Sequence, residues 1–150
     1  IQDYDAPIRL DPEFADAYHH RGVSYHSLGQ YQQTIQDYDE AIRLDPEFAI
    51  TYFHRGVSYH GLGQYQQAVQ DYDEGIRLEP QDAAAYVHRG WSYCELGQHE
   101  YAIQDYGEAI WLNPESAITY HDRGLAYHVL GKSTEAVQDF AKARELGYDP

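Results

Sequence analysis

Apolar and polar positions along the chain follow a pattern that returns every 34 residues. One segment of the pattern occurs as HRGVSYH at 20–26 and 54–60, HRGWSYC at 88–94 and DRGLAYH at 122–128. A second occurs at the same interval as QDYDA at 2–6, QDYDE at 36–40 and 70–74, QDYGE at 104–108 and QDFAK at 138–142. This spacing is typical of stacked helical hairpins, which together bury a face that no single hairpin could bury.

Glycines and prolines divide each repeat into two predicted helices. A glycine ends the first helix, where a left-handed residue costs little, at Gly29, Gly63, Gly97 and Gly131. A short motif precedes the first helix, as Asp11-Pro12-Glu13, Asp45-Pro46-Glu47, Glu79-Pro80-Gln81 and Asn113-Pro114-Glu115. We expect the Asp or Asn to cap this helix and the proline to occupy its first turn.

The first helix of each repeat has a predicted core face. Each repeat is numbered from its first residue, which is Ala15, Ala49, Ala83 or Ala117. Positions 4, 7, 8 and 11 then lie in one sector about 100° wide. In the second repeat this sector holds Tyr52, Arg55, Gly56 and Tyr59. The glycine allows a close approach of the two helices, and the tyrosines fill the space beside it. A net charge of −15 with few aliphatic residues would otherwise indicate disorder, but 16 tyrosines supply the apolar area.

An arginine at position 7 of that sector needs a partner, because a half-buried guanidinium is costly unless it is paired. The arginines are Arg21, Arg55, Arg89 and Arg123. The one acid kept in register is position 23, namely Asp3, Asp37, Asp71, Asp105 and Asp139. We predict structural Arg–Asp pairs along the array. The sequence leaves open whether each arginine pairs within its own repeat or with the preceding aspartate.

These motifs resemble the tetratricopeptide repeat family. The family pattern has an aromatic at position 4, Gly at 8, Tyr at 11, Ala at 20, an aromatic at 24, Ala at 27 and Pro at 32. The second repeat supplies Tyr52, Gly56, Tyr59, Ala68, Tyr72 and Pro80, with Gly75 at the Ala position. The resemblance implies an all-α fold, a right-handed α-solenoid. It implies a partial repeat at 1–14, consisting of the second helix only, and full repeats at 15–48, 49–82, 83–116 and 117–150.

Pro7 departs from the family pattern, because it replaces the alanine of DEAIRL in the partial repeat. Proline inside a helix removes a backbone hydrogen bond and crowds the preceding turn, at about 3 kcal/mol or more. We therefore expect the helix of residues 1–10 to be broken at Pro7 or to start late.

The resemblance further implies a concave peptide-binding groove lined by the first helices. Its expected residues are His19, His20, Val23, His26, Phe53, His54, Val57, His60, Val87, His88, Trp91, Cys94, His121, Leu125 and His128. Phe53, Val57, Trp91, Val23 and Leu125 are the expected apolar anchors. The histidines have three open interpretations: a neutral polar lining, a groove whose charge rises as histidine protonates near pH 6–7, or a metal site built from adjacent repeats.

One subtype of the family holds a chaperone's C-terminal carboxylate with Lys, Asn and Arg side chains. The corresponding positions in this chain are His19, Val23, His54, Ala84 and His88. Because none of them is Lys or Arg, we expect no such clamp.

The expected function is a protein–protein interaction scaffold that takes a peptide or partner helix in the groove, without catalysis or a cofactor. The acidic balance favours a basic partner and argues against nucleic acid, and no apolar run approaches the length of a membrane span. Cys94 stands alone and has no internal disulfide partner. The chain begins in mid-pattern without Met, so it reads as a fragment whose localisation is unknown. The alternative function is a metal-binding or self-assembling module.

The last helix and the outer faces of the second helices also carry predicted contacts. On the last helix, Ala136, Val137, Phe140, Ala143 and Arg144 lie where a next repeat would pack, which predicts a weak homodimer through the array ends. On the second helices, Asp39 with Arg43 and Asp73 with Arg77 are expected to form i,i+4 pairs. Trp111 replaces that arginine in the third repeat, where it is either a contact patch or a lone surface aromatic.

Overall fold

The computed structural model describes residues 2–11 and 13–149, and for residues 2 and 3 only the backbone. The expected pairing of Asp3 lies outside the described side chains. Within this part the chain forms nine α-helices and no strand, so the all-α prediction is confirmed. The helices are α1 (Gln2–Leu10), α2 (Ala15–Ser27), α3 (Tyr31–Leu44), α4 (Ala49–Gly61), α5 (Tyr65–Leu78), α6 (Ala83–Glu95), α7 (His99–Leu112), α8 (Ala117–Val129) and α9 (Ser133–Glu145).

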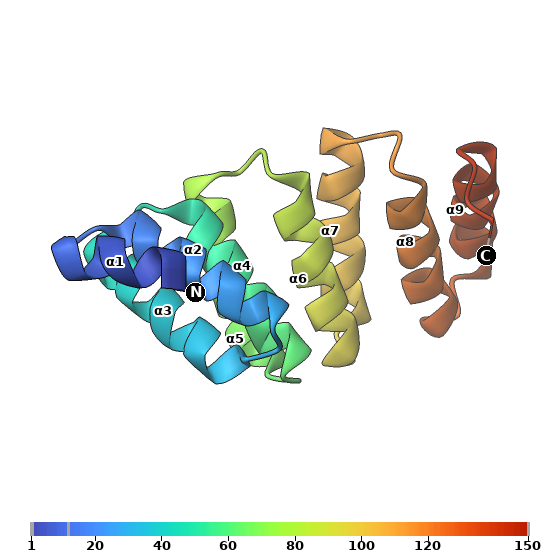
Figure 1. Cartoon of the computed structure of the whole chain (residues 1–150). Helices are drawn as coiled ribbons and strands as arrows, with labels where there is room; N and C mark the ends of the chain where they lie inside the picture. Colours follow the sequence, from blue (N-terminus) through green and yellow to red (C-terminus); the bar gives the residue numbers. More distant parts are fainter. Residues whose placement is uncertain (1, 12, 150) are drawn as a thin grey trace. The chain divides into compact units, whose positions relative to one another are not determined.

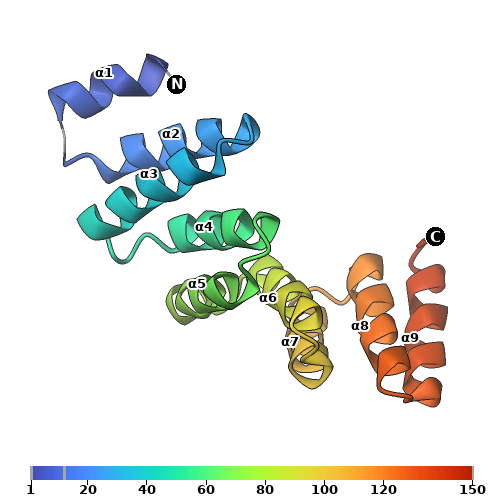
Figure 2. The ribbon, with the colours of Figure 1, turned by 90° about the horizontal axis from the view of Figure 1, so that it is seen from below.

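The chain divides into two compact units, Ile1–Glu79 with α1 to α5 and Pro80–Pro150 with α6 to α9. In the first unit, α2 packs on α3 and α4 packs on α5, and α3 also packs on α4. In the second unit, α6 packs on α7 and α8 packs on α9, and α7 also packs on α8. The hairpins follow one another in chain order along each unit (Figures 1 and 2).

Close contact between the two helices of a hairpin depends on glycine. A Cβ on Gly56 would lie 2.7 Å from Cε1 of Tyr72, a ring that is 0% exposed. Tyr38 and Tyr106 are buried in the same way against the glycines of α2 and α6. Any side chain at these glycines would push the helices apart, so the residue at position 8 sets the width of each hairpin.

The starts of the first helices differ from the prediction. The helices begin three residues later than the Asp-Pro motif suggested, with Phe14, Phe48, Asp82 and Ser116 at their N-caps. Asp45 instead follows the end of α3, and its Oδ1 accepts a hydrogen bond from the Glu47 amide at 3.1 Å. The motif therefore shapes the turn between repeats, because an aspartate bonded two residues ahead stabilises a turn as readily as a helix start.

The expected break at Pro7 is wrong. The helix α1 runs from Gln2 to Leu10 with Pro7 inside it. Pro7 stands in the second turn, so the ring affects only one preceding turn, and its φ near −65° suits a helix. Its carbonyl accepts a bond from the Asp11 amide at 2.8 Å, and α1 packs on α2. The lost hydrogen bond is thus offset by tertiary contact.

Candidate functional site

A repeated Arg–Asp pair holds the two helices of each hairpin together. Arg21 donates from Nε and Nη2 to the two oxygens of Asp37 at 2.8 and 2.7 Å. The same two-point contact joins Arg55 to Asp71, Arg89 to Asp105 and Arg123 to Asp139. Each arginine thus contacts the aspartate sixteen residues further along, in its own repeat. The bond with Asp139 raises the pKa of the Arg123 guanidinium, so the pair stays charged.

Two tyrosines enclose each of these arginines, which the sequence reasoning missed. The guanidinium carbon of Arg55 lies 5.7 Å from the ring centre of Tyr52 and 5.9 Å from that of Tyr59. The other three repeats have the same sandwich. Cation–π attraction stabilises a cation between two ring faces. The signal was the Tyr-x-x-Arg-x-x-x-Tyr spacing, which places all three side chains on one helix face.

A second acid completes the pair in the first unit. Arg21 also contacts Asp5 at 2.8 Å, and Arg55 contacts Asp39 at 2.6 Å. Asp39 therefore does not pair with Arg43 as expected, and Arg43 contacts Glu40 at 2.7 Å instead. Likewise Arg77 contacts Glu74 rather than Asp73. The reason is that Arg55 still has Nη1 free to donate after it pairs with Asp71, and this group contacts Asp39 on the preceding second helix.

His19 does not line a groove, contrary to the prediction. Its side chain is 5% exposed and lies between α2 and α4, where its Nδ1 is 2.9 Å from the Thr51 hydroxyl. Rings of His54, Phe48 and Tyr38 surround it at 5.2, 5.0 and 5.6 Å. His19 is therefore a structural residue of the interface between successive first helices, and not a ligand-facing one.

His26 belongs to the same interface. It is half-buried, and its Nδ1 lies 3.0 Å from the Ser58 hydroxyl of α4. Burial lowers the pKa of His19 to about 4, with smaller effects from His54 and His20, and burial also lowers the pKa of His54. His19 therefore stays neutral at pH 6, so the expected rise of groove charge near pH 6–7 does not come from this residue.

The other predicted groove residues differ in exposure. Exposed are His20, Leu125 and His128. Half-buried are Val23, Phe53, His54, Val57, His60, Val87, His88, Trp91, Cys94 and His121. Cys94 Sγ lies 3.6 Å from the Tyr106 hydroxyl, and burial raises the pKa of its thiol, which disfavours the reactive thiolate.

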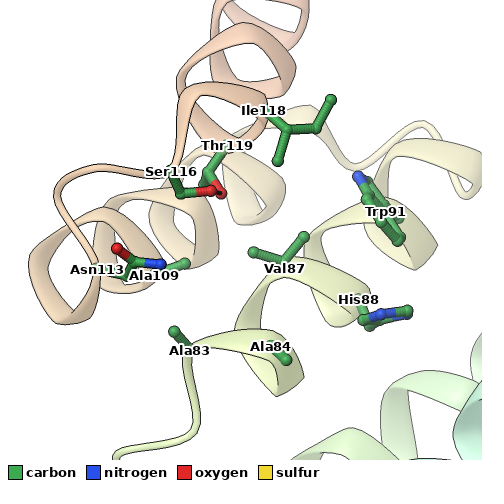
Figure 3. Close-up of a pocket in the computed structure, with 10 residues that line it drawn as sticks. All are labelled: Ala83, Ala84, Val87, His88, Trp91, Ala109, Asn113, Ser116, Ile118 and Thr119. Atoms are coloured by element: carbon green, nitrogen blue, oxygen red, sulfur yellow. Dashed lines mark hydrogen bonds between the residues drawn. The ribbon is translucent and has the colours of Figure 1, made fainter. Parts of the chain in front are cut away.

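A cavity of about 260 Å³ lies between α6 and α8, within the second unit (Figure 3). Val87 stands near its centre, with Trp91 on one side and Ile118 and Thr119 reaching in from α8. The full lining is Ala83, Ala84, Val87, His88, Trp91, Ala109, Asn113, Ser116, Ile118 and Thr119. Three of these were predicted groove residues. Among the others, Ala83, Ala84 and Ala109 at positions 1, 2 and 27 were missed because alanine contributes to a cavity only through the volume that it leaves empty.

Asp122 fixes the indole beside this cavity. Trp91 donates from Nε1 to Asp122 Oδ2 at 2.7 Å, and His121 Nδ1 lies 3.3 Å from the other carboxylate oxygen. His88 stacks edge-on against Trp91 with ring centres 4.6 Å apart. Asp122 stands at the position where the other repeats have His20, His54 and His88, a difference that the sequence analysis did not interpret. The cavity thus has a rigid aromatic wall.

The end of α9 offers less open apolar surface than expected. Ala136 and Ala143 are 2% and 1% exposed, because they pack inside their own hairpin. Phe140 lies against His121, whose ring stacks on Tyr148 at 4.2 Å. These rings and Arg144 line a second cavity, of about 280 Å³. Of the five side chains expected there, Val137 is the exposed apolar one, at 63%.

Two searches of the described residues bear on ligand classes. Residues 2–11 and 13–149 contain no group of three His, Cys, Asp or Glu side chains placed to hold a metal ion. None of the helices in the described part of the chain combines the length and apolar character that a membrane span requires.

Solved structures similar to this chain are helical repeat proteins. A crystal structure of MamA is 29% identical, covers 95% of this chain and 84% of its own, and has a TM-score of 0.92. A structure of MamA, residue 41 to the end, from Desulfovibrio magneticus RS-1 is 24% identical, covers 93% and 78%, and has a TM-score of 0.88. The first TPR domain of Spaghetti (RPAP3), bound to the HSP90 peptide SRMEEVD, is 23% identical, covers 78% and 93%, and has a TM-score of 0.76. No curated protein sequence matches the chain.

Family models match most of the chain. A model described as TPR repeat matches residues 24–63 and 90–131. Two models described as tetratricopeptide repeat match residues 49–82 and 71–104. Together these matches extend over residues 24–131 and include the hairpins α4–α5 and α6–α7 in full. The chain belongs to the tetratricopeptide repeat family, whose repeats are in general protein–protein interaction modules.

Proposed function

We propose that the chain binds a peptide segment of a partner protein through the cavity between α6 and α8. The observation that carries the proposal is this apolar recess of about 260 Å³ beside the indole of Trp91. Burying one aliphatic or aromatic side chain against Val87 and Ile118 removes apolar area from water, worth about 1.5–3 kcal/mol. Buried aromatic contacts of this kind are where binding energy concentrates in protein interfaces.

The geometry of the site supports a preformed ligand position. The indole is held by Asp122 at 2.7 Å, so little conformational freedom is lost when a ligand packs on it. Asn113 carries an exposed amide at one end of the cavity, where it can bond to a peptide backbone. In the same unit, Leu125 is an exposed predicted groove residue and extends the proposed surface beyond the anchor.

The expected ligand is a peptide with one apolar anchor and basic neighbours. The chain's net charge of −15 favours the approach of basic segments. The RPAP3 domain in the similar structure is bound to a peptide that ends in Glu, Val and Asp. We do not extend that ligand to this chain, because His19, Val23, His54, Ala84 and His88 replace the cationic clamp of such arrays and His19 is buried.

Selection of random linear peptides on the purified chain tests the proposal. We expect selected peptides to share an apolar anchor, and Trp91→Ala to weaken their binding at least tenfold by calorimetry. Val137→Ala, which trims an exposed side chain on α9 outside the cavity lining, is the matched control and should change affinity less than twofold. Equal affinity for the wild-type chain and for Trp91→Ala, in a variant with unchanged helical content, would reject this site.

A further inference from the structure

The outer face of α7 differs from those of α3 and α5 at two equivalent positions. In α3, Arg43 donates from Nε and Nη2 to the two oxygens of Glu40 at 3.0 and 2.7 Å. In α5, Arg77 makes the corresponding contact to Glu74 at 2.7 Å. In α7 the glutamate is kept as Glu108, but Trp111 stands where the arginine is expected.

This substitution leaves a carboxylate without its cation. Glu108 forms no ion pair with any described residue, whereas the fork of Glu40 or Glu74 is filled from one turn away. Trp111 is 72% exposed, which is unusual for the largest apolar side chain and marks a contact surface. An exposed indole one turn from an unpaired carboxylate offers both halves of a guanidinium-binding surface.

A third change on the same helix enlarges the surface. Tyr101 stands where α3 and α5 have Gln33 and Gln67, and it is 55% exposed. Its ring lies 5.3 Å from that of Tyr93, which keeps it in a defined place. At 100° per residue, Tyr101, Glu108 and Trp111 fall within one sector of α7 about 80° wide. None of the three lines the cavity between α6 and α8.

We propose that this face of α7, formed by Tyr101, Glu108 and Trp111, binds an arginine-containing segment of a partner. The incoming guanidinium takes the place that Arg43 and Arg77 fill in the other repeats, with its fork on Glu108 and its plane on the indole. Arginine suits this site better than lysine because its planar group pairs with a carboxylate at two points and stacks on aromatic rings. The chain's net charge of −15 draws such a segment in.

The test uses an acetylated, amidated pentapeptide with two arginines, and its two-lysine counterpart, titrated by calorimetry. We expect Glu108→Gln to weaken binding of the arginine peptide at least threefold. Trp111→Arg restores the closed pair of α3 and α5 and should weaken binding at least tenfold. Because both side chains lie on the surface, these variants keep the helical content of the wild-type chain.

Two controls separate this site from general attraction and from the cavity. Glu74→Gln changes the charge by the same amount on a face where the guanidinium position is already filled, and should weaken binding less than twofold. Trp91→Ala should have no effect on binding of the arginine peptide. The result of this test is therefore independent of whether the cavity between α6 and α8 binds a peptide. Equal weakening of arginine-peptide binding by Glu108→Gln and Glu74→Gln, or equal affinity of the wild-type chain for the arginine and lysine peptides, would overturn the proposal.

Discussion

The interface between α2 and α4 is filled, whereas the interface between α6 and α8 is open. At position 5, His19 packs against the following repeat and bonds to Thr51, while the equivalent Val87 is too short to reach Thr119. At position 12, His26 bonds to Ser58, while the equivalent residues Cys94 and Ala126 are apolar. The threonine of the open interface bonds to Ser116 instead, at 2.7 Å. The side chains at positions 5 and 12 of a shared fold thus distinguish a filled interface from one that contains a cavity.

The largest effect is expected from removing the aspartate paired with an inner arginine, and its size should depend on whether that arginine has a second acid among the described residues, as Arg21 does and Arg123 does not. Asp139→Ala leaves the half-buried Arg123 without an acid, because Gly107 stands where Asp5 and Asp39 serve the first unit. We expect a loss of about 3 kcal/mol in the free energy of unfolding, measured by urea denaturation. Asp37→Ala should cost about 1 kcal/mol less, since Arg21 keeps Asp5. Equal losses would show that the second acid contributes nothing.

His19 should make the filled interface sensitive to acid. The folded pKa of about 4 lies below the ordinary 6.5, so the unfolded chain binds the proton more readily. The stability that His19 contributes is complete above pH 6.5 and is lost as the pH falls toward 4, by up to about 3 kcal/mol. We expect hydrogen exchange to show α2 and α4 losing protection across this window. The His19→Val variant should lack this component; an unchanged pH profile in that variant would contradict the assignment.

Closing the open interface should abolish the proposed binding. Val87→His places the ring of the filled interface beside Thr119, so the cavity loses its space. We expect at least a tenfold loss of peptide affinity by calorimetry, about 1.4 kcal/mol, with stability kept or raised. Phe53→His, at the same position of α4 but outside the cavity lining, is the control for adding a histidine. A variant that binds peptide as the wild type does would separate the function from the cavity.

The smallest effect is expected from placing an acid at position 107, beside Arg123. Gly107→Asp restores the carboxylate that faces the inner arginine in the first unit, where a Cβ would lie 3.9 Å from Arg123 Nη1. The gain should be about 0.5–1 kcal/mol in the free energy of unfolding, because the pair is partly exposed. Gly107→Ala separates the gain in helix propensity from that of the charge. A gain no larger than that of the alanine variant would mean that the added carboxylate does not pair.

Sequence reasoning reached the fold but only part of the site. The 34-residue period, the left-handed glycines and the close-packing glycines followed from local rules, and Gly29 does have a φ of 70°. Trp91 and Val87 were named as groove residues, but nothing in the pattern distinguished them from His19. The alanines that open the cavity carried no signal, because a cavity is defined by the volume that several distant residues leave empty.

By itself the sequence determined the helical hairpins, the tyrosine core and the presence of an acid partner for each inner arginine. Those features depend on periodicity, which assigns residues to faces within one helix. Only the tertiary structure decided that Arg55 binds both Asp71 and Asp39, that Pro7 is tolerated, and that His19 turns toward the next repeat. Positions 5 and 12 lie at the edge between the predicted groove and the neighbouring helix. Whether a side chain at these positions faces the predicted groove or packs on the next first helix depends on its contacts with residues 32 positions further along the chain, such as Thr51 for His19 and Ser58 for His26.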